Sequence, residues 1–399
     1  MVVLYALQNE VTMRKKICFC TTLGGTIEFV TDLSVYLAEH ENYDVTWIAG
    51  DDERLHKYIG EHIHFIPLSM KRGIGIDGPW IIWQMYRIFR REKFDIIQYS
   101  TRNAGTYAAI AAWLAGIKTR LYCQWGMMFI ALKGIKRMLL KWDEQLIVSL
   151  STVVESESFS MYETAIAHGI YTADKASVIW NGSACGVNLD HYIMANKPKW
   201  RKEVRQELGI SEDACVFGYC GRVTRDKGLN ELFAAFKKIT EDKGRKKDAF
   251  LLIIGRNDNV ETIKPELYTW AKASPYVIFT GFTNEVPKYY SALDVFTSLS
   301  YREGFGLVVI EAAAMGVPGI VSDALGQRDT IEHLKTGYLV HTYHVGNVVE
   351  AMNYFIEHPE KAIEMGTRAR EVVEKKYEQK ELLRRLAAHR NQLIVDATK

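Results

Sequence analysis

The sequence predicts an α/β fold in which two Rossmann-like domains face each other across a cleft. A chain of 399 residues is long enough for two domains of ordinary size, each with its own core. Short apolar runs alternate with helical stretches in both halves, which is typical of parallel sheets with helices on both faces. Between the halves the hydrophobic periodicity lapses over residues 186–198, which we interpret as the linker.

The first domain, residues 13–190, is expected to open with a strand, a glycine turn and a helix. The strand is predicted at Lys16–Thr21 and the helix at Ile27–His40, with Gly24 and Gly25 in the turn between them. The remaining strands are predicted at 43–49, 64–67, 96–99 and 119–124, and two of the helices at 79–91 and 127–142. This unit is typical of nucleotide-binding α/β domains, although a Gly-Gly turn alone is also found as a plain tight connection.

The second domain, residues 191–375, is expected to repeat the α/β alternation. Its elements are predicted as a helix at 200–208, strands at 216–220, 251–255, 277–279 and 294–299, and a helix at 307–315. The last stretch, Tyr377–Ile394, carries a stripe of leucines at helical spacing. We expect this amphipathic helix to pack its stripe inside the protein.

Composition and charge exclude several classes of protein. With 48% hydrophobic and 25% charged residues the chain is typical of a soluble globular protein. A net charge of +2 lacks the basic excess of a general nucleic-acid binder. No run of about 18 apolar residues is present, so we expect no membrane-spanning helix. The six cysteines lie mostly in apolar runs without metal-ligand spacing, which favours free thiols in a reducing cytoplasm.

The N-terminus does not resemble a secretory signal, because MVVLYALQNEVT has no basic residue before its short apolar run. Met13, followed by Arg-Lys-Lys, is a better beginning for the first strand. We therefore expect translation to start at Met13, which makes residues 1–12 an N-terminal tail.

The central stretch for function is YREGFGLVVIEAAAMGVPG, residues 301–319. It follows an apolar strand and predicts a turn freed by Gly304 and Gly306, and then a helix that Gly316 and Pro318 end. The first amide hydrogens of such a helix lack partners and carry the positive end of its dipole. The turn therefore favours phosphate binding.

Two acids flank this turn, Glu303 before it and Glu311 inside the helix. A rise of about 1.5 Å per residue places Glu311 roughly 7 to 8 Å along the axis from Gly306. The spacing favours opposite ends of one extended ligand, with one acid on a ribose and the other on a sugar, over a glycosidase pair flanking a single bond. Taken singly, Glu303 could be a solvated turn residue and Glu311 an acid of the first helical turn.

Two cations form a second candidate group. Arg222 follows the strand at 216–220, and Lys227 lies just before the next helix, so both project from the carboxyl edge of the sheet, where open α/β folds bind ligands. Basic residues in a polar loop are usually solvated. Together with the glutamate pair, however, these two favour a site for an anionic ligand.

Two helical stretches of the first domain combine large apolar residues with cations. Residues 79–91 end in Arg87, Arg90 and Arg91, and no acid occurs between Lys118 and Asp143, where residues 127–142 carry four basic residues. This composition suits an anionic membrane surface, on which each basic residue contributes about 1 kcal/mol. A pair of core helices with basic edges is the alternative.

As a set, these segments resemble the family 4 retaining glycosyltransferases, which have the GT-B fold. The glutamate pair is one match, and the others follow in the family's order: GYCGRVTRDKG (218–228), FLLIIG (250–255), VIFTGFTNEVPKYYSALDVFTSLS (277–300) and GQRDTIEHLKTGYLV (326–340). Upstream, the segments TTLGGTIEFV (21–30), STRNAG (100–105) and VIWNGSACGVNLDHY (178–192) look like the subgroup that builds bacterial capsular and other surface polysaccharides.

The resemblance implies a role for each matching residue on the donor side. Arg222 and Lys227 would hold the diphosphate, where charge develops as the sugar leaves, and act in catalysis with Glu303, which would hold the donor sugar. Glu311 would hold the ribose hydroxyls. The residues expected to line the donor through the turn and the helix start are Gly304, Phe305, Gly306 and Leu307.

On the acceptor side, Gly24 and Gly25 would line the cleft near the transferred sugar. Trp125 stands directly before Gly126, where the family usually has a histidine. Tryptophan can stack on a sugar but cannot do the polar work of histidine, so this departure puts activity in doubt. We expect Arg328 to meet the donor or the acceptor, with a surface ion pair as the alternative.

The predicted reaction is sugar transfer from a nucleoside-diphosphate sugar, a UDP-hexose or UDP-N-acetylhexosamine, to a lipid-linked glycan with retention. No Asp-any-Asp signature follows a strand, so we expect no metal and no other cofactor.

The C-terminal helix, 376–399, would pack back on the first domain, as in other GT-B proteins. We expect a cytoplasmic protein, peripheral on the inner face of the cell membrane. A nucleotide-sugar epimerase and a decayed nucleotide-sugar-binding protein are the alternatives.

Overall fold

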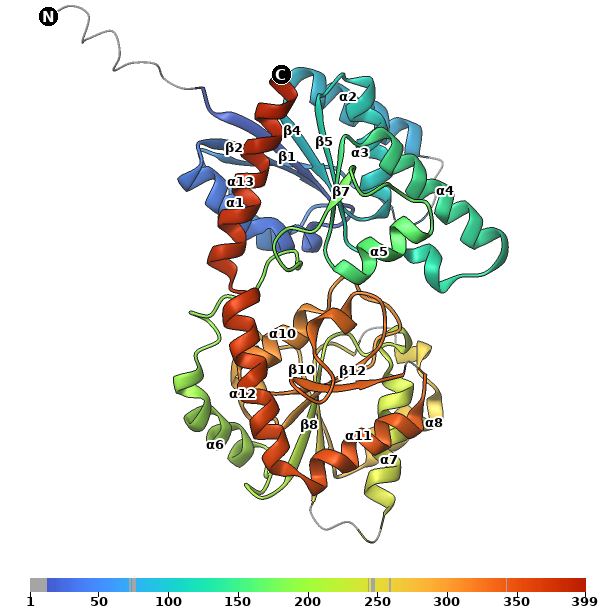
Figure 1. The fold of residues 1–399 in the computed structure, drawn as a ribbon, viewed down its shortest axis with the longest axis vertical. Helices are drawn as coiled ribbons and strands as arrows, with labels where there is room; N and C mark the ends of the chain where they lie inside the picture. The colour runs from blue at the N-terminus through green and yellow to red at the C-terminus, as the bar shows by residue number, and fades with distance from the viewer. Residues whose placement is uncertain are drawn as a thin grey trace, which may run out of the picture.

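The computed structural model describes residues 13–399 except 72, 74–76, 243, 245–247, 258–259 and 342, so the predicted tail at 1–12 lies outside the described residues. The described chain forms two parallel sheets, each with helices on both faces (Figure 1). The strand orders are β3-β2-β1-β4-β5-β6-β7 and β10-β9-β8-β11-β12-β13. Both sheets therefore have the doubly wound topology that the alternating pattern predicts.

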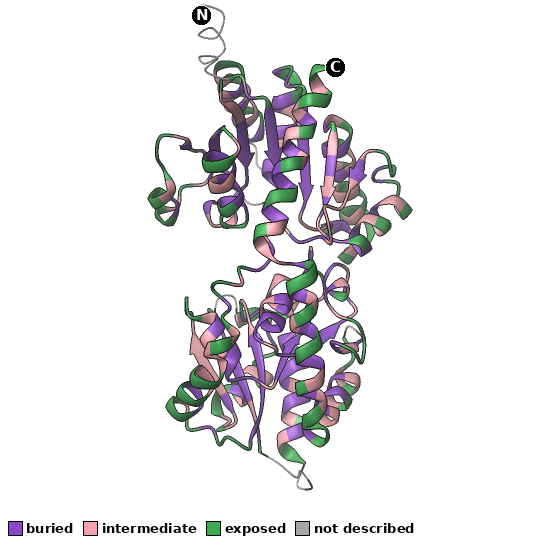
Figure 2. Cartoon of the chain, turned by 60° about the vertical axis from the view of Figure 1, so that its left-hand side comes forward, coloured by how far each residue is buried: buried purple, intermediate pink, exposed green. Residues whose placement is uncertain are grey.

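The first sheet fills the N-terminal domain. Its strands are β1 (Lys15–Cys20), β2 (Tyr43–Ala49), β3 (Ile63–Pro67), β4 (Ile96–Tyr99), β5 (Thr119–Gln124), β6 (Val153–Ser156) and β7 (Ala176–Ser177). One face is covered by α1 (Glu28–His40) and the other by α2 (Gly78–Glu92), α3 (Arg102–Leu114), α4 (Gly134–Leu150) and α5 (Phe159–Ala167). Figure 2 shows that the strands are buried and that exposed residues gather on the outer helices.

The second sheet fills the C-terminal domain. Its strands are β8 (Cys215–Cys220), β9 (Ala249–Ile254), β10 (Val277–Gly281), β11 (Val295–Ser298), β12 (Gly319–Ser322) and β13 (Gly337–Val340). One face packs on α7 (Leu229–Glu241), α8 (Pro265–Ala273) and α11 (Val345–Glu357), the other on α6 (Lys197–Glu207), α9 (Val286–Ser291), α10 (Leu307–Ala314) and α12 (Pro359–Lys376). The carboxyl ends of its strands carry the loops that meet the first domain.

The last two helices join the domains. After α12 packs on α10 in the second domain, α13 (Gln379–Thr398) runs along α1 and β5 of the first (Figure 1, red). Four leucines of α13, at 382, 383, 386 and 393, are buried in the same core as β1 and β2. The predicted leucine stripe therefore packs internally, although the helix runs over 379–398 rather than 377–394.

Several predicted boundaries differ from the structure. The helix predicted at 200–208 is α6, Lys197–Glu207, so it begins inside the predicted linker at 186–198. The helix predicted at 127–142 does not exist as one element, because residues 128–131 form a short 3-10 turn, Lys133 is extended, and α4 begins only at Gly134 and runs to Leu150. The first strand begins one residue earlier than predicted and ends at Cys20, with Thr21 in the turn. In the described chain, no helix is both long and apolar enough to cross a bilayer.

Candidate active site at the domain junction

The strongest contact in the predicted donor site joins Lys227 to Glu303. Lys227 ends the short 3-10 turn after β8, and Glu303 follows β11 in the same sheet. The Lys227 Nζ atom lies 2.5 Å from Glu303 Oε1, and both side chains are partly buried. The loops that carry them are also joined directly, because the Tyr301 amide donates to the Asp226 carbonyl at 3.0 Å. Residues that are far apart in the sequence therefore form one charged group at the sheet edge.

Arg222 lies at the same edge but is held more loosely. Its guanidinium is half exposed, and Asp226, four residues along the chain, lies 3.8 Å from it. Its carbonyl oxygen accepts a hydrogen bond from the Tyr219 hydroxyl at 2.6 Å, so this contact engages the backbone and not the side chain. Such a cation is available to an anionic ligand.

The glycine turn before α10 is pressed against the first domain. A Cβ atom at Gly304 would lie 2.6 Å from the Trp125 carbonyl oxygen and 2.5 Å from Glu157 Oε2, so no larger residue fits there. Gly306 caps α10 with a φ of 99°, which lies in the left-handed region that favours glycine. Leu307 then opens the helix, as predicted, with its amide end at the junction.

Phe305 is placed differently from the other turn residues. Its side chain is only 3% exposed and packs edge-to-face on Tyr377, the first residue after α12, with ring centroids 5.3 Å apart. The ring therefore belongs to the core of the second domain, and only the backbone of Phe305 remains for a ligand.

Glu311 lies apart from the Lys227–Glu303 pair, among tyrosines. It is the fifth residue of α10, so the alternative that it is a first-turn acid is wrong. The Tyr290 hydroxyl donates to Glu311 Oε2 at 3.5 Å, and Tyr192 from the linker also hydrogen-bonds to it. Burial raises the pKa of Glu311 to about 7, although the two tyrosines act in the opposite direction. A carboxylate held by such weak contacts can accept hydrogen bonds from two hydroxyl groups of a ligand.

The first domain contributes the opposite edge of the junction. Trp125 follows β5 and meets the ring of Phe29 edge-to-face at 5.4 Å, so its indole belongs to the wall beside α1. Gly24 and Gly25 form the short 3-10 turn after β1 and pack against Asp52 and Arg54. The structure thus places the predicted acceptor-side residues at the carboxyl ends of β1 and β5.

The loop after β12 bridges the two domains. Asp329 Oδ2 accepts from the Ser160 amide at 2.8 Å, and the Gly326 amide donates to Ser160 Oγ at 3.0 Å. Arg328, between them, is exposed and makes no ion pair with any described residue, so the alternative of a surface ion pair finds no partner there. Its guanidinium is free for a ligand.

Glu157, which was not predicted from the sequence, lies within reach of this turn. The signal was available, because Glu157 is an acid directly after β6, at the same edge as Trp125 after β5. We did not predict β6, and so the position of this acid was not recognised. Among the described residues, no group of three or more His, Cys, Asp or Glu side chains could hold a metal ion.

Comparisons with known proteins agree with this architecture. Residues 23–184 match the family Glycosyltransferase Family 4, and residues 201–372 match Glycosyl transferases group 1. The chain is 28% identical over 364 residues to the capsular polysaccharide biosynthesis glycosyltransferase CapM of Staphylococcus aureus, which covers 91% of this chain and 93% of CapM.

Two further relatives bear on the fold and the activity. The UDP-Gal:α-D-GlcNAc-diphosphoundecaprenol α-1,3-galactosyltransferase of Escherichia coli is 25% identical over 320 residues, covering 79% of this chain and 81% of that protein. The crystal structure of Anabaena HepE in complex with UDP superimposes with a TM-score of 0.75 at 18% identity, covering 95% of this chain and all of that chain. Because the two matched families account for both domains and their order, the chain belongs to the family 4 glycosyltransferases and has the GT-B fold.

Proposed function

We propose that this glycosyltransferase moves a sugar from a UDP-sugar to a lipid-linked glycan, with retention, in the synthesis of a bacterial surface polysaccharide. The observation that carries the proposal is the Lys227–Glu303 pair at 2.5 Å, beside Arg222 and the glycine turn at the start of α10. This group combines the charges that a diphosphate needs with an acid that can hold a sugar hydroxyl.

The reaction itself explains why cations are needed at this edge. Breaking the bond between the sugar and the phosphate leaves extra negative charge on the departing nucleotide. At about 4 Å and an effective dielectric near 20, each cation attracts that charge by on the order of 4 kcal/mol before desolvation. Lys227, Arg222 and the amide end of α10 together stabilise it without a divalent metal, and so we propose that no metal is required.

The names of the relatives support the substrate class. CapM is named for capsular polysaccharide biosynthesis, the E. coli relative for a UDP-galactose donor and a lipid-diphosphate acceptor, and HepE was crystallised with UDP. The epimerase alternative is not favoured, because both matched families are glycosyltransferases. Retention is proposed from the family resemblance.

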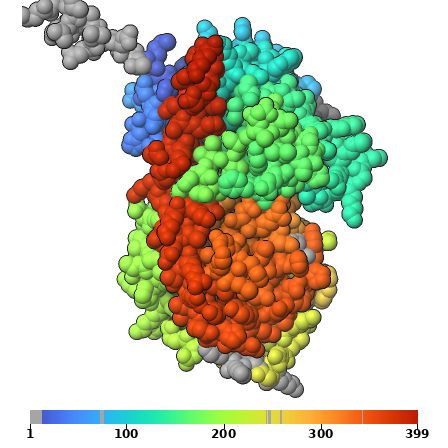
Figure 3. Space-filling view, in the orientation of Figure 1, coloured from blue at the N-terminus to red at the C-terminus, as the bar shows by residue number. Residues whose placement is uncertain are grey.

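An exposed apolar and basic surface on α4 supports the proposal that the protein binds a membrane. We call it the α4 surface: the exposed apolar residues Ile135, Met138, Leu139 and Trp142, with the basic residues Lys133, Lys136, Arg137 and Lys141. Ile135 is 72% and Trp142 56% exposed, and in the described chain none of the four cations makes an ion pair. The helix projects from the side of the first domain (Figure 3, right). We propose that it rests on anionic lipid at the inner face of the membrane.

Thermal unfolding with nucleotides tests the donor site. Wild type and Arg222→Ala would be scanned with UDP, GDP, ADP and their sugars, each with and without EDTA. Ligand at about a hundred times its Kd adds roughly 2.7 kcal/mol to the native state, which raises the Tm by several degrees. We expect a UDP-selective shift that survives EDTA and is lost in Arg222→Ala.

The matched control is Arg368→Ala, which removes an exposed arginine on α12 whose only ion-pair partner among the described residues is Glu364. It should keep the full shift. If no nucleotide shifts the wild type, the donor site is absent and the decayed-protein alternative takes its place. A shift that EDTA abolishes would refute metal independence alone.

A further inference from the structure

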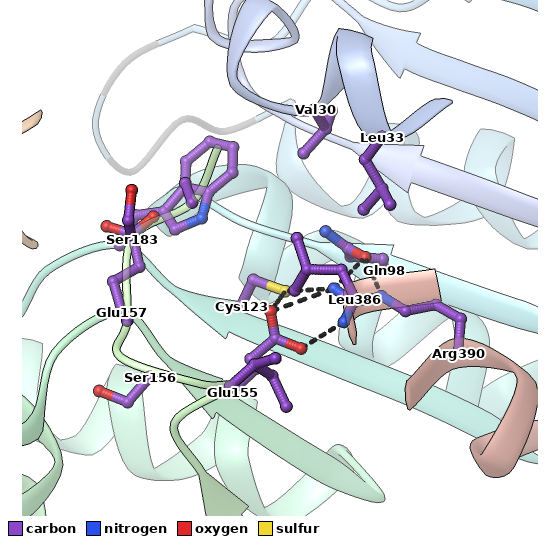
Figure 4. Close-up of a pocket in the computed structure, with 14 residues that line it drawn as sticks. Val30, Leu33, Gln98, Cys123, Glu155, Ser156, Glu157, Ser183, Leu386 and Arg390 are labelled. Carbon is purple, nitrogen blue, oxygen red and sulfur yellow. Dashed lines mark hydrogen bonds and ion pairs between the residues drawn. The ribbon is translucent and has the colours of Figure 1, made fainter. Parts of the chain in front are cut away.

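Two glutamates at the end of β6 share one side of the strand but have different surroundings. Glu155 lies within β6 and Glu157 directly follows it, while Ser156 between them points to the other side (Figure 4). Glu155 is bound by Arg390 of α13, whose Nη1 lies 2.5 Å from Glu155 Oε2. Figure 4 shows Glu157 beside Ser183, away from this arginine.

The carboxylate of Glu157 has no hydrogen-bond or ion-pair partner among the residues that the structure describes. Only its backbone is engaged, since its carbonyl oxygen accepts from the Ser183 amide at 2.8 Å. The residue is nevertheless partly buried. A partly buried carboxylate that lacks a partner costs free energy, and such costs are commonly retained where a ligand supplies the missing partner.

This carboxylate faces the donor turn from the opposite domain. Glu157 Oε2 lies 2.5 Å from the point where a Cβ atom at Gly304 would stand, so the carboxyl group touches the turn that follows Glu303. The Trp125 carbonyl oxygen approaches the same point at 2.6 Å. Glu157 is thus the acid that the first domain directs at the place where the donor sugar is proposed to lie.

The space beside Glu157 is small, and polar and apolar side chains line it together. It is a cavity of about 10 Å³, lined by Glu157, Trp125, Ser183 and the Glu155–Arg390 pair, among others. Such a volume holds about one water or one hydroxyl group. A hydroxyl group that enters this space would find there the carboxylate of Glu157, which no described side chain engages.

We infer that Glu157 is a specificity-determining residue, whose carboxylate accepts a hydrogen bond from a hydroxyl group of the sugar acceptor. The inference rests on the proposed function. The proposed donor contacts of Arg222, Lys227, Glu303 and Glu311 all come from the second domain, and Glu157 is the carboxylate that reaches the turn from the other side. An acceptor must approach the donor sugar from that side, and its hydroxyl groups suit an acceptor-only carboxylate.

The charges around Glu157 set the sign of a pH dependence. Burial, and then the negative charges of Glu155 and Glu303, raise the pKa of Glu157 well above its usual range. The negative charge of Glu155 is offset by ion pairs with Arg390 and His389, and the negative charge of Glu303 is offset by its ion pair with Lys227. The nearby thiols of Cys123 and Cys185 stay neutral, since burial raises the pKa of both. Acceptor affinity should therefore rise with pH as Glu157 ionises.

The test compares Glu157→Gln and Glu157→Asp with wild type. The matched control is Glu163→Gln, an exposed glutamate on α5. Donors are UDP-galactose, UDP-glucose and UDP-N-acetylglucosamine, and the acceptor probe is a lipid-diphosphate N-acetylglucosamine. We expect Glu157→Gln to keep the UDP-induced thermal shift and to lower kcat/KM for the acceptor by roughly 10- to 100-fold. Glu157→Asp should recover part of this loss, and the rise with pH should vanish in Glu157→Gln.

Each other outcome overturns the inference in a distinguishable way. Unchanged acceptor kinetics in Glu157→Gln would mean that the carboxylate does not meet the acceptor. Loss of the UDP-sugar shift in that variant would assign Glu157 to the donor instead, and loss of folding in both variants would make its role structural. If wild type shifts with UDP but transfers none of the three sugars, the proposed acceptor class fails and takes the inference with it.

Discussion

The Arg390–Glu155 pair in the first domain and the Lys227–Glu303 pair at the domain junction are both 2.5 Å ion pairs, but their surroundings differ. Arg390 is 1% exposed and is also bound by the Gln98 side chain at 2.9 Å. Lys227 is 24% exposed, and Glu303 is its only hydrogen-bond or ion-pair partner in the described chain. The first pair is satisfied within the protein, whereas the second can exchange its partner for a ligand. We therefore expect the first pair to stabilise the fold and the second to serve the proposed reaction.

The largest effect is expected when the buried Arg390–Glu155 pair is broken. Arg390→Met leaves Glu155 buried without its cation, which should destabilise the protein by about 3–5 kcal/mol. Urea unfolding at pH 7 measures this, with Arg384→Met as the control, because Arg384 on the same helix is exposed and should cost less than about 1 kcal/mol. The variant should still bind UDP at temperatures where it is folded. A stability equal to wild type would show that α13 is held by its leucines alone.

The contribution of the Arg390–Glu155 pair to stability should depend on pH in the acid range. Burial opposes ionisation of Glu155, but the charges and hydrogen bonds of Arg390 and His389 together outweigh it and lower the pKa of Glu155 to about 2. A lowered carboxyl pKa contributes stability above the unfolded value, near 4.5, that is lost as the pH falls toward 2. Unfolding free energies of wild type between pH 6 and pH 3 should therefore drop more steeply than those of Arg390→Met. Parallel curves would contradict the assignment.

The next largest effect is expected when the Lys227–Glu303 pair at the junction is broken. Lys227→Met should lower kcat/KM for transfer by about 10²–10³-fold, because the charge that develops on the leaving diphosphate loses a cation. Stability should change by less than about 1 kcal/mol, since Glu303 keeps access to water. Lys238→Met, an exposed lysine on α7, is the control for both assays. A destabilisation comparable with that of Arg390→Met would show that the two pairs do not differ in kind.

A smaller effect sharpens the comparison at Glu311, whose pKa burial raises to about 7. The ionised form accepts ribose hydroxyls more strongly, so the affinity for a UDP-sugar should increase several-fold between pH 6 and pH 8. The stability of the free protein should move the opposite way, because a raised carboxyl pKa contributes stability that is lost as the pH rises from 4.5 through 7. Calorimetric titration of UDP-glucose, whose diphosphate does not titrate there, measures the affinity. Glu311→Gln should give a flat profile, and a sloping one would assign the titration elsewhere.

The smallest effects concern the α4 surface, whose cations make no ion pair within the part of the chain that the structure describes. Reversing Lys136 and Arg137 to glutamate should weaken binding to vesicles that contain phosphatidylglycerol, at about 1 kcal/mol for each basic residue removed. Reversing Lys237 and Lys238 on α7 gives the same change in net charge away from that surface. Co-sedimentation with anionic vesicles and with phosphatidylcholine vesicles distinguishes a specific role of the α4 surface from an effect of net charge. Equal losses in both variants would indicate an effect of net charge alone.

The sequence by itself determined much of the fold and which charged residues stand at the strand ends of the second sheet. Local apolar periodicity and glycine turns are encoded within short stretches, so most of the predicted strands and the helix α10 at Leu307–Ala314 could be read directly. Arg222, Lys227 and Glu303 could be singled out because each follows or flanks a strand end. Short strands such as β7, with two residues, carry too little pattern to be recognised. The break before α4 was not predicted either, because the apolar and basic residues on both sides of Lys133 continue one helical pattern through it.

Only the tertiary structure decided which charged residues meet. Arg390 and Glu155 are 235 positions apart, and Lys227 and Glu303 are 76 apart, so no local pattern could pair them. The same holds for Glu157, which becomes notable because Gly304 of the other domain packs against it. Phe305 likewise matches the donor motif in sequence, yet its ring lies in the core against Tyr377. Periodicity is a property of neighbours along the chain, whereas a site is made by residues that packing brings together from distant segments.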